Sequence, residues 1–310
     1  MTFSDINTLG AKRIPFLFIS DFKAQNLKVI LLDSLEDIEF EIQDTYVSIL
    51  HDKTFEKTPI TFSKYLKKFN KIIEEIKSGN TYLLNLTAQT KIQTSLHLKE
   101  IYSYANAQFK LRYKDEFVCF SPERFVKIEG ERIHTYPMKG TIDASIEDAE
   151  NKIMNNAKEK AEHIMVVDLL RNDLSIKAKN VKVEKFRYIT KIEAGDKELL
   201  QVSSHISGEV GSLWHESLGD ILESLLPAGS ISGAPKKSTL EIIEEVEGYD
   251  RGYFSGVFGV YDGKSFDSAV MIRFIEKTHD GYIYKSGGGI TLDSDANQEY
   301  DELIDKIYLP

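Results

Sequence analysis

The chain has 310 residues, enough for one large domain or two ordinary ones, and 42% of them are hydrophobic, which is sufficient for a sizeable core. Lys and Arg number 39 against 49 Asp and Glu, and the resulting net charge of -10 argues against nucleic acid as a main partner. Cys119 is the single cysteine, which excludes an intrachain disulfide and fits a reducing, cytoplasmic setting. The apolar runs are too short for a signal peptide or a bilayer span, so we expect no membrane association.

Hydrophobic periodicity and turn residues predict the secondary structure. Residues 64–77 form an amphipathic helix, which Ser63 could cap and Gly79 could end. Asp262-Gly263 is a strong hairpin signal. In chain order, the predicted elements are strands at 15–19 and 27–32, the helix at 64–77, strands at 82–90, 116–120 and 125–136, helices at 146–155, 158–170, 216–225 and 238–246, strands at 257–274 and 282–286, and a helix at 297–308.

The order of these elements indicates the fold class. Strands and helices occur in blocks with hairpin turns between strands, rather than in regular alternation. This order favours an α+β fold with largely antiparallel sheets over a doubly wound parallel sheet. The chain contains no internal repeat, low-complexity segment or Pro/Ser-rich linker, so we expect a single packed unit.

Two predicted helical segments carry glutamates three residues apart, Glu159 with Glu162 and Glu299 with Glu302. At that spacing both members of a pair lie on one helix face. Two such helices facing each other could hold Mg²⁺, which binds carboxylate oxygens and leaves room for a substrate carboxylate. Such pairs are also common on solvated helices, and the spacing alone favours that simpler interpretation.

Two glycine-containing segments could bring backbone N–H groups close to an anion. Residues 227–236 form a small-residue loop that leads into a helix, with Pro235 suited to its first turn. The loop lacks the spacing of a nucleotide or dinucleotide motif, so neither ATP nor NAD follows. Gly287, Gly288 and Gly289 follow a predicted strand and suit either a close approach to a ligand or a flexible loop.

Two side chains in constrained turns could take part in catalysis. Lys139, just after a predicted strand and before a glycine, could act as a nucleophile or base when neutral, although most lysines are merely solvated. Glu123 could act as a general acid, or it could pair with Arg124 or Lys127.

Two further side chains suit ligand binding. Arg273 lies in the predicted apolar strand 268–274, where a positive charge usually needs an anion, either an internal carboxylate or a ligand. His205 lies among small polar residues and could donate to a developing oxygen, but a structural histidine is at least as common.

These signals follow a fixed order, in residues 79–87, 121–125, 136–142, 159–175, 203–210, 226–236, 252–263, 268–274 and 286–303. In this order the segments resemble the chorismate-utilising enzymes, and within them the component I branch of aminodeoxychorismate synthases. The resemblance implies an α+β fold with a large antiparallel β-sandwich core, helices packed outside and the active site in a cleft. It also implies a short strand-rich portion over residues 1–61, packed on a chorismate-binding catalytic domain over residues 62–310.

The same resemblance implies functional residues. Glu162 and Glu302 would hold Mg²⁺, with Glu159 and Glu299 in its outer shell. The implied catalytic residues are Lys139 as nucleophile, Glu123 as the general acid that helps the 4-hydroxyl of chorismate leave, and His205 near the reacting ring. The implied substrate contacts are Tyr253, Arg273, Ser232, Lys306 and the backbone of Gly287, Gly288 and Gly289.

Lys139 separates close relatives from one another. Anthranilate synthase component I has alanine at this motif position, whereas the aminodeoxychorismate enzymes have a lysine that is thought to attack ring carbon 2. The sequence therefore favours amination of chorismate at carbon 4, a step toward 4-aminobenzoate and folate. Anthranilate synthase component I is the nearest alternative, and a non-catalytic ligand-binding relative is a more distant one.

Two further features bear on this assignment. Leu83 stands where aminating relatives usually carry glutamine and water-adding relatives carry a lysine base. An apolar side chain cannot activate water, so Leu83 argues against isochorismate formation. Cys119 lacks the context of a glutaminase nucleophile, and we therefore expect ammonia to come from a separate glutamine amidotransferase subunit.

Overall fold

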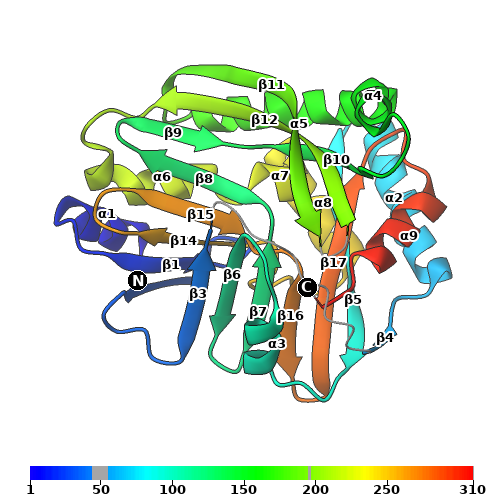
Figure 1. Cartoon of the computed structure of the whole chain (residues 1–310), viewed down its shortest axis with the longest axis horizontal. Coiled ribbons are helices and arrows are strands. Elements are labelled where there is room, and N and C mark those ends of the chain that lie inside the picture. The colour runs from blue at the N-terminus through cyan, green and yellow to red at the C-terminus, as the bar shows by residue number, and fades with distance from the viewer. Residues whose placement is uncertain (44–54, 195–196, 310) are drawn as a thin grey trace.

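A computed structural model describes residues 1–43, 55–194 and 197–309 (Figure 1). Within these residues the strands form two antiparallel sheets, of nine and eight strands. The first sheet has the order β10 (Met138–Asp143), β12 (Lys197–Glu209), β9 (Arg132–Thr135), β8 (Arg124–Glu129), β15 (Phe266–Val270), β14 (Val257–Tyr261), β1 (Phe16–Ser20) and β2 (Leu27–Leu31), and β11 (Lys179–Ala194) pairs with β12. The second has the order β13 (Gly233–Ala234), β5 (Leu83–Gln93), β17 (Gly281–Ile290), β16 (Phe274–Thr278), β7 (Phe117–Ser121), β6 (Phe109–Tyr113) and β3 (Ile38–Ile42), and β4 (Glu56–Thr58) pairs with β5.

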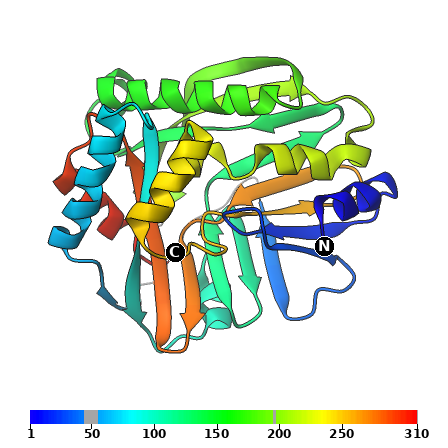
Figure 2. The same cartoon turned by 180° about the vertical axis from the view of Figure 1, so that it is seen from behind.

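Helices cover the outer faces of the sheets. In Figure 2, α5, α6 and α1 lie across the first sheet, and α8 and α2 lie on the second. The helices are α1 (Phe3–Ala11), α2 (Phe62–Lys77), α3 (Leu98–Tyr104), α4 (Ala149–Asn155), α5 (Ala157–Ser175), α6 (Leu218–Leu225), α7 (Gly229–Ser232), α8 (Lys236–Glu247) and α9 (Ala296–Asp305), with a 3₁₀ turn at Trp214–Ser217. No helix in the described ranges is both long enough and apolar enough to cross a membrane.

Strand β1 shows how the layers are held together. It is buried on both faces, and its side chains alternate between two apolar clusters. Phe16 and Phe18 pack under the helices of the first sheet, whereas Leu17 and Ile19 face the second sheet. The predicted α+β class with large antiparallel sheets is therefore confirmed. The N-terminal 61 residues supply strands to both sheets.

The described elements also correct several predictions. The helix at 64–77 is confirmed but begins two residues earlier, with Thr61 rather than Ser63 at its N-cap. The strand expected over 125–136 is a hairpin of β8 and β9, because Gly130 adopts a positive φ of 58°. Sequence patterns missed α1 and the long hairpin β11–β12, which carries many charged residues in place of an apolar alternation.

A buried ion pair ties α8 to the second sheet. The side chains of Glu247 and Arg251 are each 1% exposed, and their closest atoms are 2.6 Å apart. Glu247 also accepts hydrogen bonds from the Thr87 backbone and hydroxyl, at 2.8 and 2.7 Å. Arg251 donates to the carbonyls of Asn85 and Ile231. The pair is thus fully hydrogen-bonded, as a buried charge must be.

We expect Glu247→Ala to lower the free energy of unfolding by about 3–5 kcal/mol, because Arg251 would be left buried without a partner. Urea denaturation followed by circular dichroism measures this change. Glu244→Ala is the matched control. Glu244 lies on the same helix as Glu247 and makes an exposed ion pair with Lys23, so this substitution should cost less than about 1 kcal/mol. Equal losses in the two variants would contradict the assignment.

Candidate active site

A cavity of about 260 Å³ lies where β5 and β17 of one sheet meet β10 of the other. Its size suits a small ring compound. It brings together several residues predicted from sequence, which are Glu123, Lys139, Arg273, Gly287, Gly288, Gly289, Glu302 and Lys306. The elements that carry them are far apart in sequence and meet only in the folded chain (Figure 1).

Lys139 follows strand β9, as the sequence predicted, but it also lies within the next strand, β10, which the sequence did not predict. A bulge between Met138 and Thr141 and a positive φ of 85° at Gly140 interrupt the pairing of β10 with β12 there. The Lys139 ammonium is 3.6 Å from a Glu162 oxygen. A Cβ placed on Gly289 would lie 3.4 Å from the Lys139 Nζ, so the tip of the lysine reaches β17.

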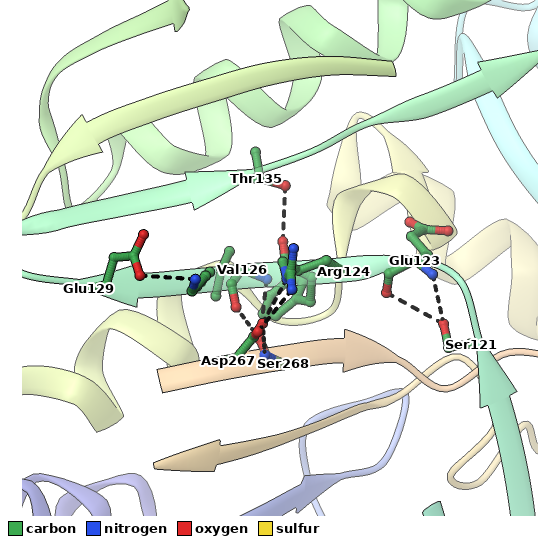
Figure 3. Close-up of polar contacts among 10 residues, drawn as sticks. Ser121, Glu123, Arg124, Val126, Glu129, Thr135, Asp267 and Ser268 are labelled. Atoms are coloured by element: carbon green, nitrogen blue, oxygen red, sulfur yellow. Dashed lines mark hydrogen bonds and ion pairs between the residues drawn. The ribbon is translucent and has the colours of Figure 1, made fainter. Parts of the chain in front are cut away.

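Glu123 is held in a turn between β7 and β8 (Figure 3). Its backbone N–H donates to the Ser121 hydroxyl at 3.0 Å, and its carboxylate accepts a hydrogen bond from Ser230 at 2.5 Å. Removal from bulk water raises the pKa of Glu123, although the Ser230 hydrogen bond and the charge of Lys139 oppose the rise. A carboxyl that keeps its proton to higher pH is suited to act as a general acid.

The neighbouring charges of Glu123 are engaged elsewhere. Arg124 makes a two-pronged contact with Asp267, with Nε at 2.8 Å and Nη2 at 3.0 Å from the carboxylate (Figure 3). Lys127 pairs with Glu129 at 2.9 Å. The partner of the Glu123 carboxylate is therefore the Ser230 hydroxyl, whereas Arg124 pairs with Asp267.

The two predicted carboxylate pairs lie close enough to influence each other, since Glu162 on α5 is an electrostatic neighbour of both Glu299 and Glu302 on α9. A Cβ on Gly288 would lie 3.4 Å from a Glu299 oxygen and 3.8 Å from a Glu302 oxygen. Burial raises the pKa of Glu162, and the charge of Glu159 contributes to the rise. Burial also raises the pKa of Glu299, with a contribution from the charge of Glu302. The fold therefore concentrates negative charge at this end of the cavity.

Three lysines neutralise much of this charge. In addition to the contact of Lys139 with Glu162, Lys158 is 3.5 Å from Glu299 and Lys306 is 2.6 Å from Glu302. As these side chains stand, no three acidic, His or Cys side chains in the described ranges are close enough to bind a metal ion. The donor chemistry nevertheless fits Mg²⁺, because every candidate ligand is a carboxylate oxygen and the four carboxylates exceed the three ammonium groups by one negative charge.

The far end of the cavity is formed where the chain crosses from β15 to β16. Arg273 lies in this crossing with a positive φ of 50°, and not inside an apolar strand as expected. The three glycines 287–289 lie inside β17 and pair with residues 85–87 of β5, so they do not form a flexible loop. On its other edge β17 pairs with β16 only as far as Lys285. The Gly287 carbonyl accepts a hydrogen bond from Lys306 at 2.9 Å, and a Cβ on Gly288 would lie near Glu299 and Glu302, so the glycines extend toward the glutamate end of the cavity.

Six residues predicted for the site lie outside the cavity lining. Three are the glutamates described above, Glu159, Glu162 and Glu299, and the other three are Tyr253, His205 and Ser232. Tyr253 stacks on Phe117 at 5.3 Å, with the Lys28 ammonium 5.4 Å from its ring. His205 stacks on Tyr136 at 4.7 Å, on strand β12. Ser232 is buried, and its hydroxyl donates to the Ala228 carbonyl at 3.0 Å within α7.

The structure adds residues that sequence patterns missed. The cavity lining also includes Asn85, Gln201, Ser230, Ser255 and Tyr284. Three of them lie within segments already singled out, Asn85 in 79–87, Ser230 in 226–236 and Ser255 in 252–263. Gln201 and Tyr284 have no distinguishing local pattern and are brought to the cavity by tertiary contacts.

Comparison with known protein families supports this architecture and cavity. A sequence model described as chorismate binding enzyme matches residues 37–309. The chain belongs to the chorismate-binding enzymes. This membership covers almost all of the chain, including the cavity and both carboxylate pairs.

The chain is similar to several proteins of this family. It is 46% identical over 98% of its length to an uncharacterized PabA-like protein of Haemophilus influenzae, of which it covers 94%. It is 28% identical over 99% of its length to aminodeoxychorismate synthase component 1 of Bacillus subtilis, of which it covers 71%. A menaquinone-specific isochorismate synthase from Escherichia coli shares the fold, with a TM-score of 0.74 at 14% identity over 97% of this chain and 79% of that one.

We expect Ser230→Ala to raise the pKa of Glu123 further, because the hydrogen bond from Ser230 stabilises the charged carboxylate. Infrared titration of the carboxyl band, assigned by its loss in Glu123→Gln, measures the shift. Ser224→Ala is the control, since that hydroxyl donates to the Ile221 carbonyl within α6. A Glu123 pKa unchanged in Ser230→Ala would show that the hydrogen bond does not form in solution.

Proposed function

We propose that this chorismate-binding enzyme is component I of an aminodeoxychorismate synthase, which replaces the 4-hydroxyl of chorismate with an amino group. The observation that carries the proposal is the position of Lys139, whose ammonium lies in the cavity beside Gly289. Glu123 lies on the same cavity wall and is an electrostatic neighbour of Lys139. A nucleophile and a general acid can therefore reach one bound ring.

Catalysis would take two displacement steps. In the first, neutral Lys139 Nζ bonds to ring carbon 2, the ring double bonds shift, and the C4–O bond breaks as Glu123 protonates the departing hydroxyl to water. In the second, ammonia bonds to carbon 4, the double bonds shift back, and the bond to Lys139 breaks. The new ammonium returns a proton to Glu123, so both residues end in their starting states.

The opposite ends of the cavity would hold the two carboxylates of chorismate. Arg273 would bind the enolpyruvyl carboxylate. Glu162 and Glu302 would hold Mg²⁺, with Glu159 and Glu299 around them. When bound, Mg²⁺ would supply positive charge for the ring carboxylate. Lys139 and Lys306 would have to move away from Glu162 and Glu302 to admit the metal.

Ammonia would come from a separate glutamine amidotransferase. Cys119 is the only cysteine in the sequence and is buried in β7, where burial raises the pKa of its thiol. A buried neutral thiol is not a glutaminase nucleophile. The names of similar proteins, which include PabA-like and component 1, are consistent with a two-subunit enzyme.

The nearest alternative is anthranilate synthase component I, which would aminate a different ring position. Incubation with chorismate, Mg²⁺ and ammonium, with and without aminodeoxychorismate lyase, separates the two. Formation of 4-aminobenzoate only when the lyase is present supports the proposal. Anthranilate as the product would contradict the proposal and favour anthranilate synthase component I. If no chorismate is consumed, a non-catalytic relative is favoured.

We expect Lys139→Ala to abolish aminodeoxychorismate formation while chorismate still binds, because the variant has no nucleophile. The measurements are product formation by chromatography and the Kd of chorismate. Lys182→Ala, on an exposed part of β11, is the control and should keep the wild-type rate. A normal rate in Lys139→Ala would rule out the covalent step.

We expect Glu162→Gln and Glu302→Gln each to weaken Mg²⁺ binding at least about tenfold, because each removes a charged ligand. Isothermal titration calorimetry with Mg²⁺ alone measures this without reliance on activity. Glu150→Gln, on the exposed face of α4, is the control. Unchanged affinity in both site variants would place the metal elsewhere.

A further inference from the structure

Two buried hydroxyl groups in the cavity lining have no hydrogen-bond partner. The side chains of Ser255 and Tyr284 are 1% and 0% exposed, and neither hydroxyl is paired. The backbone N–H of Tyr308 lies near the Tyr284 hydroxyl, but it forms no hydrogen bond of normal geometry. An unpaired buried hydroxyl is costly, and most such groups in folded proteins find a partner. Both residues line the cavity, so a bound ligand can supply the missing partner.

The same end of the cavity contains a positive charge without a carboxylate partner. Arg273 is half-buried and contacts the ring of Tyr308, at 5.2 Å from its centroid. In the described part of the chain no carboxylate pairs with it. Arg273 is also close enough to Tyr284 to affect its hydroxyl electrostatically. The groups gathered here are hydrogen-bond donors that lack an acceptor, an arrangement suited to a carboxylate.

The backbone supports this assignment independently. Ser255 and Arg273 both have positive φ, 64° and 50°, which is unfavourable for residues with a side chain. Two backbone hydrogen bonds hold this conformation. One runs from the Ser255 N–H to the Met271 carbonyl at 2.8 Å, and the other from the Met271 N–H to the Gly256 carbonyl at 2.7 Å. Strain of this kind persists where the surrounding structure enforces it, and it is concentrated at ligand sites.

We propose that Ser255 and Tyr284 are substrate-binding residues whose hydroxyl groups, together with Arg273, hydrogen-bond one carboxylate of the substrate. This inference rests on the proposed function, in which that carboxylate belongs to the enolpyruvyl group of chorismate. Burial raises the pKa of Tyr284, so its hydroxyl stays neutral and can donate. A neutral donor adds hydrogen bonding without adding charge beside Arg273.

The proposal assigns to Ser255 and Tyr284 the role that sequence motifs gave to Tyr253. Tyr253 lies on the other side of the backbone, packed against Phe117 and Lys28. Its neighbours Phe254 and Ser255 line the cavity instead. The substrate-binding hydroxyl that the sequence resemblance implied for Tyr253 would therefore come from Ser255 and Tyr284.

Tyr284→Phe and Ser255→Ala test the proposal, because each removes only a hydroxyl. We expect each to raise the KM and the Kd for chorismate about tenfold, with kcat changed less than twofold, since the lost contact is made equally in the ground and transition states. The Tm of Tyr284→Phe without substrate should be equal to or higher than that of the wild type, because the hydroxyl is unpaired. Tyr282→Phe, two residues earlier on β17 and outside the cavity, is the matched control.

Direct measurement of chorismate binding separates this inference from the proposed reaction. If the enzyme makes a different aminated product, the weakened binding in the two variants still supports the carboxylate contact. An unchanged Kd in both variants would overturn the inference, whatever the product. A lower Tm in Tyr284→Phe with unchanged Kd would instead assign the hydroxyl a structural role, and would overturn it as well.

Discussion

The buried ion pair between Glu247 and Arg251 joins three parts of the chain that form the back of the cavity. Glu247 is the last residue of α8, and its carboxylate accepts hydrogen bonds from the backbone N–H and the hydroxyl of Thr87 in β5. Arg251 donates to the carbonyls of Asn85 in β5 and Ile231 in α7. Charges buried in this way are stable only when every hydrogen-bonding site is used, so the pair fixes the position of β5 relative to both helices. The glycine strand β17, which pairs with β5, is positioned through the same contacts.

The cavity depends on a second constraint, the meeting of two sheets with different strand directions. Figure 1 shows most strands of the first sheet running across the view, while those of the second run from top to bottom. Where they meet, Lys139 from the first sheet reaches Gly289 of the second. Both sides of this junction use irregular backbone, a bulge at β10 and the left-handed conformation of Ser255 and Arg273. Such features are tolerated because the flanking sheets are extensively paired.

The electrostatics of the cavity are divided between its ends. One end carries four glutamates and three lysines, in contact with one another. The other carries Arg273 and unpaired hydroxyl groups, with no described carboxylate paired to the arginine. A substrate with two carboxylates would be oriented by this difference, with its ring between Glu123 and Lys139. The net charge of -10 has little influence here, because local charges at short range in a cavity outweigh distant surface charges.

The sequence by itself determined the fold class and much of the site. Hairpin signals and blocks of strands were sufficient to predict an α+β fold, since they depend on local composition. The roles of Glu123, Lys139 and Arg273 came from the resemblance of short motifs to the chorismate-utilising enzymes. The tertiary structure alone decided which way each side chain points. It turned Tyr253 toward Lys28, left His205 on the sheet outside the cavity, and brought Tyr284 to Arg273. Side-chain direction follows from backbone conformation and from packing between distant segments, and neither can be derived from local pattern.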